Sequence, residues 1–212
     1  VLLTSAENTL RLVATDSYRL AVCETYSAPE AAAEDFSLII PGVVFHDVLT
    51  MPSLTEKILI GTTSNQIVFS FGNTTYISRK TEGTYPDYRQ LLPKAYASAV
   101  TVDPEQFLSA LRRVATIATT MPIMKLDIDA EAQTMKLSIT TRDQGESTEY
   151  IPVQVEGDSM ALSLNHHYVA ECLISAPDRE KILIELQSPT LPTIFKSTGK
   201  INYLYLVMPS LL

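Results

Sequence analysis

Three stretches of the sequence combine a short apolar strand pattern with an amphipathic helical pattern that follows directly. The helical patterns begin near residues 41, 104 and 165, which are 63 and 61 residues apart. Asp103 and Asn165 are good N-cap residues, and Pro41 and Pro104 suit a first helical turn, where no N–H group is needed. The strand patterns that precede these starts read FSLII, SAVTV and MALSL.

Each predicted helix is followed by three runs that alternate apolar and polar residues, which is typical of half-buried strands. The letters EKILI even recur at 56–60 and 180–184, 124 residues apart, or two repeat lengths. The pattern therefore predicts a repeated β-α-β-β-β unit of about 60 residues. Residues 10–26 resemble the last hairpin of an earlier unit, so we expect about three and a half units and a chain that begins inside one.

The helical pattern at 104–119 has one apolar face, formed by Phe107, Leu111 and Val114 among others, and one polar face. Such a helix packs one face on a sheet and leaves the other to solvent. Helices on one side of antiparallel sheets define an α+β fold. We therefore expect two repeat units per domain, with paired helices packed on antiparallel sheets.

Composition narrows the classes of function. The chain has 212 residues, 46% of them hydrophobic, which excludes a disordered tail. Its 16 basic and 24 acidic side chains give a net charge of −8, which argues against gripping nucleic acid through a basic surface. Apolar runs stay well short of the roughly 20 residues that span a bilayer, so no membrane partner is expected. Cys23 and Cys172 lie far apart and form no CxxC pair, which favours a reducing, cytoplasmic setting.

Signatures of catalysis or of a resident cofactor are sparse. The sequence contains no Walker A or GxGxxG motif, and its three histidines do not have the spacing of a zinc site. Asp127, Asp129 and Glu131 alternate along a predicted strand and could hold a divalent metal, so a metal-dependent, nuclease-like enzyme is one alternative. A purely structural repeat domain is another. The interpretation that we favour has no catalytic residue, no metal and no cofactor.

Three motifs carry a family resemblance. VATDSYRLAV at 13–22, TYPDYRQLLP at 84–93 and YLVMPSLL at 205–212 resemble motifs of the bacterial DNA sliding clamp, the beta subunit of DNA polymerase III. The repeat unit is also similar to the building block of that family. The resemblance implies a DNA-clamp fold, with residues 1–92 as a middle domain that lacks its N-terminal part and 93–212 as a complete C-terminal domain.

The resemblance also implies a function. Members of the family are non-catalytic processivity factors of the replicative polymerase, and they form a head-to-tail homodimeric ring that encircles duplex DNA. Because a ring is held topologically, an acidic protein can serve this role without binding phosphates tightly. Arg112 and Arg113 are then candidates for weak contact with DNA, and Thr116 and Ile117 for the dimer interface.

The main site that the resemblance implies is an apolar cleft between the two domains. It would bind short peptide motifs of DNA polymerase III, other polymerases, the clamp loader and repair proteins. Gln90 takes the place of a basic residue found in many relatives. The implied residues are Thr15, Ser17, Tyr18, Arg19, Leu20, Pro86, Gln90, Leu91, Asn165, Tyr168, Pro192, Leu206, Val207, Met208 and Pro209.

Overall fold

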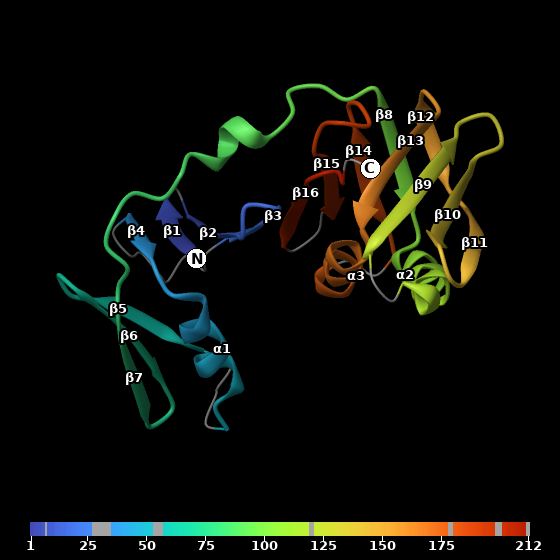
Figure 1. The fold of residues 1–212 in the computed structure, drawn as a ribbon. Helices are drawn as coiled ribbons and strands as arrows, with labels where there is room; N and C mark the ends of the chain where they lie inside the picture. Colours follow the sequence, from blue (N-terminus) through green and yellow to red (C-terminus); the bar gives the residue numbers. More distant parts are fainter. Residues whose placement is uncertain are drawn as a thin grey trace. The chain divides into compact units, whose positions relative to one another are not determined.

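The structure, a computed structural model, describes residues 1–6, 8–26, 35–52, 57–118, 121–177, 180–197 and 201–210 (Figure 1). It divides into two compact units, each described by itself below. The N-terminal unit is Val1–Ala14 with Glu24–Asp87, and the C-terminal unit is Thr15–Cys23 with Tyr88–Leu212. The order of elements confirms the predicted α+β repeat, because each of the three α-helices among the described residues follows a strand and precedes further strands.

The N-terminal unit contains two small antiparallel sheets. One has the order β2-β1-β4, and the other has the order β5-β6-β7. Its core lies between these sheets and α1, and includes Leu3, Val44 and Phe69. The elements are β1 Leu2–Ala6, β2 Thr9–Thr15, β3 Arg19–Tyr26, β4 Phe36–Ile39, α1 Gly42–Thr50, β5 Leu59–Thr62, β6 Gln66–Phe71 and β7 Thr74–Arg79. The last residue of β2, Thr15, and the part of β3 up to Cys23 belong to the C-terminal unit.

The C-terminal unit also has two sheets, with α2 and α3 side by side (Figure 1). The strand orders are β12-β8-β14-β15-β16-β3 and β11-β10-β9-β13. The elements are η1 Tyr88–Leu91, β8 Ser98–Val102, α2 Pro104–Val114, η2 Ala115–Ile117, β9 Ile123–Asp129, β10 Thr134–Thr141, β11 Gly145–Pro152, β12 Gln154–Gly157, β13 Met160–Asn165, α3 His166–Ser175, β14 Ile182–Leu186, β15 Thr193–Ser197 and β16 Asn202–Val207. No helix among the described residues has both the length and the apolar character that a bilayer crossing requires.

Local sequence explains the helix starts and the buried faces. The Asp103 carboxylate caps α2 by accepting hydrogen bonds from the backbone N–H groups of Glu105 (2.8 Å) and Gln106 (3.1 Å). Phe107 on this helix is fully buried in the core of the C-terminal unit. In β9, every second side chain is buried, as the alternating pattern predicts.

Four details differ from the predicted elements. Residues 2–6 form β1, which their pattern did not indicate. Pro41 is the N-cap of α1 rather than part of its first turn, because its ψ of 135° is extended. The α2 helix tightens to a 3-10 turn at Ala115–Ile117, where β-branched Thr116 and Ile117 disfavour the α-helix. One of the three strand runs predicted after the second helix, ESTEYIPVQV at 146–155, is split at Val153, whose N–H group donates to the carbonyl of Gln133 (3.0 Å) instead of continuing the ladder.

Candidate functional site

The turn between β2 and β3 is shaped by its own side chains. The Thr15 hydroxyl donates to the Arg19 carbonyl (2.8 Å) and accepts from the Ser17 N–H group (3.2 Å). Asp16 Oδ1 accepts from the N–H groups of Tyr18 (3.1 Å) and Arg19 (3.0 Å). Ser17 takes the left-handed conformation, with φ 77°, that reverses the chain. The turn therefore presents Tyr18, 63% exposed, at its tip.

Arg19 connects this turn to α3 and β16 within the C-terminal unit. Its Nε atom donates to Asp16 Oδ2 (2.9 Å), and its Nη1 atom donates to the Tyr205 hydroxyl (3.1 Å) and to the Glu171 carboxylate. The guanidinium carbon lies 4.4 Å from the centroid of the Tyr168 ring, in cation–π geometry. Burial alone would lower the pKa of Arg19, but hydrogen bonds to Asp16, Glu171 and Tyr205 outweigh burial and raise it.

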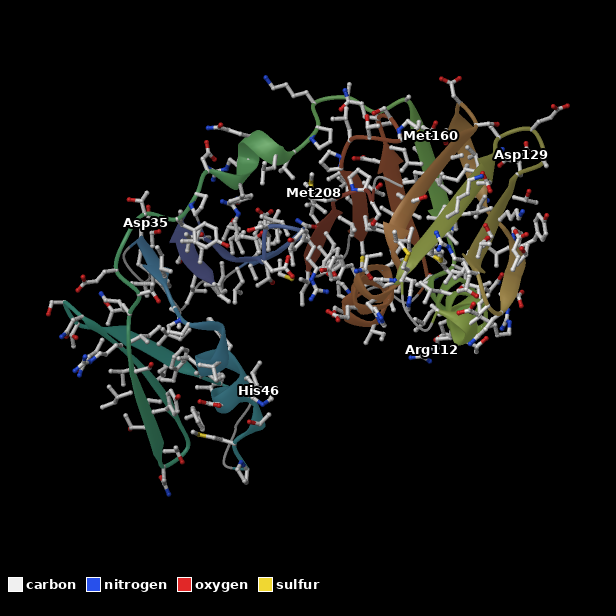
Figure 2. The ribbon with its side chains drawn as sticks, viewed as in Figure 1. Asp35, His46, Arg112, Asp129, Met160 and Met208 are labelled. Carbon is white, nitrogen blue, oxygen red and sulfur yellow. The ribbon has the colours of Figure 1, made fainter. Side chains whose placement is uncertain are left out.

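Met208 lies next to the same turn. It follows the last residue of β16, and its backbone N–H group donates to the Tyr18 carbonyl (2.9 Å). Its side chain is 41% exposed, and Figure 2 labels it. We call Tyr18, Arg19, Tyr168 and Met208 the Tyr–Met patch. This patch combines two aromatic rings, a flexible thioether and a fixed guanidinium group, which are the kinds of groups that bind peptides.

Three residues predicted for the peptide site lie beneath the surface. Leu20, Leu206 and Val207 are at most 2% exposed, so their side chains pack in the core and support the strands that carry the patch. Pro209, which follows Met208, is half-buried.

Asn165 caps α3 and so positions the first turn, which carries Tyr168. Its side-chain oxygen accepts a hydrogen bond from the His167 N–H group (2.9 Å). The neighbouring His166 is buried, and its Nε2 atom has no partner among the described residues. Burial, followed by the nearby His167 charge, lowers the pKa of His166 to about 4.

The remaining residues predicted for the peptide site lie elsewhere along the chain. Gln90 and Leu91 are exposed and belong to η1, and Pro192 is half-buried just before β15. Pro86 is exposed and belongs to the N-terminal unit. The assignment of these four residues to a peptide site stays a prediction, as it does for the residues described above.

The two arginines predicted to face DNA have different surroundings. Arg113 forms a bidentate pair with Glu149, with Nε–Oε1 at 2.8 Å and Nη2–Oε2 at 3.2 Å, so its charge is largely compensated. Arg112 is exposed and has no ion pair among the described residues (Figure 2). Beyond them, the Thr116 hydroxyl donates to the Arg113 carbonyl (2.8 Å), and Ile117 packs partly against the core of the C-terminal unit.

The carboxylates that suggested a metal site already have protein partners. Asp127 pairs with Lys125 (2.7 Å), and Asp129 Oδ1 accepts from the N–H groups of Glu131 (3.0 Å) and Ala132 (2.9 Å) in the turn after β9. In the part of the chain that the structure describes, no three acidic, His or Cys side chains gather as metal ligands would. The nuclease-like alternative therefore finds no support.

Two residues central to the site were not found from the sequence. Glu171 lies 152 positions from Arg19, and Tyr205 lies 186 positions from it, so no local pattern links them. Asp16 carries a recognisable signal, because an Asp at the start of a turn often accepts hydrogen bonds from the next backbone N–H groups.

The fold is shared with solved bacterial beta subunits of DNA polymerase III. A solved beta subunit of DNA polymerase III from Thermotoga maritima superposes with TM-score 0.89 at 25% identity, and one from Caulobacter crescentus with 0.87 at 26%. Each superposition covers 100% of this chain and 57% or 58% of the solved one. The chain belongs to the DNA polymerase III beta subunit family, because the family's central-domain model matches residues 1–87 and its C-terminal-domain model matches 89–211.

Curated relatives agree with this assignment. A beta sliding clamp of Synechococcus elongatus is 32% identical over 204 residues, which are 94% of this chain and 54% of the relative. A beta sliding clamp of Staphylococcus aureus is 32% identical over 205 residues, 96% of this chain and 54% of the relative. The chain therefore spans about half the length of the curated relatives it matches.

Proposed function

We propose that residues 1–92 and 93–212 are the central and C-terminal domains of a DNA sliding clamp, a non-catalytic processivity factor of the replicative polymerase that needs no cofactor and acts in the cytoplasm. Membership of the beta subunit family and the names of its relatives support this proposal. The net charge of −8 is compatible with it, because a clamp that slides along duplex DNA must not hold phosphates tightly.

In the full-length protein, the clamp is a homodimeric ring around duplex DNA. Arg112 is the better candidate for weak contact with phosphates, because the charge of Arg113 is compensated by Glu149. Thr116 and Ile117, in the turn after α2, are candidates for the subunit interface.

The Tyr–Met patch is the anchor of a site for short peptide motifs carried by polymerases, the clamp loader and repair proteins. One observation carries this proposal: Arg19 and the Met208–Tyr18 backbone hydrogen bond bring together apolar groups from three distant segments, namely the exposed Tyr18 and Met208 and the half-buried Tyr168. Tyr, Met and Arg are enriched where proteins bind each other. Because the backbone of the turn and of the C-terminal strand is already joined before a peptide arrives, this part of the site has less conformational entropy to lose on binding.

The test is a fluorescence anisotropy titration of the chain with a labelled synthetic peptide that carries a clamp-binding motif of a bacterial replicative polymerase. Met208→Ala removes an exposed anchor, so we expect it to weaken binding about tenfold, as truncation of an interface anchor typically does. Met121→Ala is the matched control, because Met121 is 57% exposed and lies in the loop before β9.

The parent chain and Met121→Ala are expected to bind with the same affinity. Failure of the parent chain to bind, or equal loss in the two variants, would contradict the assignment of the peptide site to the Tyr–Met patch.

A further inference from the structure

The segments that build the Tyr–Met patch carry an excess of negative charge. Residues 15–20, α3 and residues 202–209 contain three ionised side chains at neutral pH: Asp16, Arg19 and Glu171. Two carboxylates and one guanidinium group leave a net charge of −1 beside the patch. The α3 helix has no basic residue in its last turn that would offset this charge.

The charges also differ in how they face solvent. The Arg19 side chain is 24% exposed, while those of Asp16 and Glu171 are 45% and 57% exposed. Arg19 already donates to both carboxylates and to Tyr205, and its guanidinium group lies over Tyr168. An incoming peptide therefore meets the carboxylates more readily than the guanidinium group.

Glu171 is the more accessible carboxylate and lies one helical turn after Tyr168 on α3. Only one of its two oxygens has a protein partner among the described residues, namely Arg19. Asp16, by contrast, uses Oδ1 for two backbone N–H groups and Oδ2 for Arg19. Glu171 thus keeps acceptor capacity beside a ring of the patch.

We propose that Glu171 is a specificity-determining residue of the peptide site, which selects peptides with Lys or Arg beside their apolar anchors over peptides with Asp or Glu there. The inference rests on the proposed function, because it concerns the charge of the peptides that the clamp would bind. The Glu171 carboxylate attracts a Lys beside the apolar anchors and repels a Glu in the same place, so both effects favour binding of the basic peptide. For partly exposed charges the two effects together amount to about a fivefold difference in affinity at low salt.

The test compares two labelled peptides that share a clamp-binding motif and differ in one flanking residue, Lys in one and Glu in the other. Both are titrated against the full chain at about 30 mM and about 500 mM NaCl, because screening separates charge selection from apolar contact. We expect the lysine peptide to bind about fivefold more tightly at low salt, and the ratio to fall towards one at high salt.

Two variants test whether Glu171 causes the difference in affinity between the two peptides. Glu171→Gln keeps an oxygen that can accept from Arg19 and removes the charge, so the low-salt ratio is expected to fall to about twofold or less. Glu131→Gln is the matched control, because it removes one exposed carboxylate from the turn after β9, and it should keep the parent ratio.

The outcomes are distinguishable. Equal binding of the two peptides by the parent chain, or an unchanged ratio in Glu171→Gln, overturns the role of Glu171 while the peptide site stands. Failure of the parent chain to bind either peptide overturns the proposed function and this inference together.

Discussion

Arg19 is the residue whose removal tests the construction of the site most severely. Arg19→Met keeps an unbranched apolar stem of similar reach and deletes the guanidinium group. The change breaks the ion pairs with Asp16 and Glu171, the hydrogen bond to the Tyr205 hydroxyl and the contact with Tyr168. We expect the C-terminal unit to lose stability and the Tyr–Met patch to lose its fixed arrangement.

The size of the loss follows from the exposure of each partner. The two ion pairs involve carboxylates that are 45% and 57% exposed, so each contributes about 0.2–1 kcal/mol. The cation–π contact adds about 0.5–1 kcal/mol. Tyr205 is 6% exposed, and leaving its hydroxyl without a partner costs about 1–3 kcal/mol. Together these effects lower the free energy of unfolding by about 2–6 kcal/mol.

Native-state hydrogen exchange, followed by mass spectrometry of fragments that contain β15 and β16, measures this loss in the C-terminal unit alone. The control is Arg112→Met, the same chemical change at an exposed arginine without an ion pair among the described residues, which should alter stability by less than about 0.5 kcal/mol. A loss below about 1 kcal/mol in Arg19→Met, or equal losses in both variants, would refute the role of Arg19 as the connection between turn, helix and strand.

The remaining predictions concern pH and backbone conformation. The pKa of His166 is lowered from 6.5 to about 4, so below its ordinary pKa the unfolded chain binds a proton that the folded chain does not. Protonation of His166 therefore leaves the free energy of unfolding unchanged above pH 6.5 and lowers it as the pH drops from 6.5 towards 4. Thermal melting should show this decrease in the parent and a smaller one in His166→Phe. Gly157 has φ +103°, and a Cβ atom there would lie 2.1 Å from the Ala97 carbonyl oxygen. Gly157→Ala should therefore lower stability by more than about 2 kcal/mol in urea denaturation, whereas Gly61→Ala, with nothing within 4 Å of its Cβ position, should not.

The repeat could be predicted from the sequence because short-range sequence patterns mark its strands and helix starts. Alternation in β9 and the capping residues Asp103 and Asn165 each depend on neighbours a few positions away, and the structure confirms them. β1 was not predicted, because its LLTSA sequence does not alternate clearly between apolar and polar residues. Its register is set by pairing with β2 and β4. The break at Val153 likewise depends on Gln133, which belongs to another strand connection.

The site was predictable in part. The motif around Arg19 and the motif at Met208 could be read from a family resemblance, and the structure places Tyr18, Arg19 and Met208 in the C-terminal unit with a backbone hydrogen bond between Tyr18 and Met208. The roles of Glu171 and Tyr205 could not be read, because they come from folding that brings residues more than 150 positions apart into contact.

A co-crystal structure of this chain with a clamp-binding peptide from a bacterial replicative polymerase tests the central claim most directly. We predict that the apolar side chains of the peptide contact Tyr18, Tyr168 and Met208 while Arg19 keeps its contacts with Asp16 and Glu171. A peptide that binds elsewhere on the chain, with these three side chains left in solvent, would contradict the proposal that the Tyr–Met patch is the peptide site.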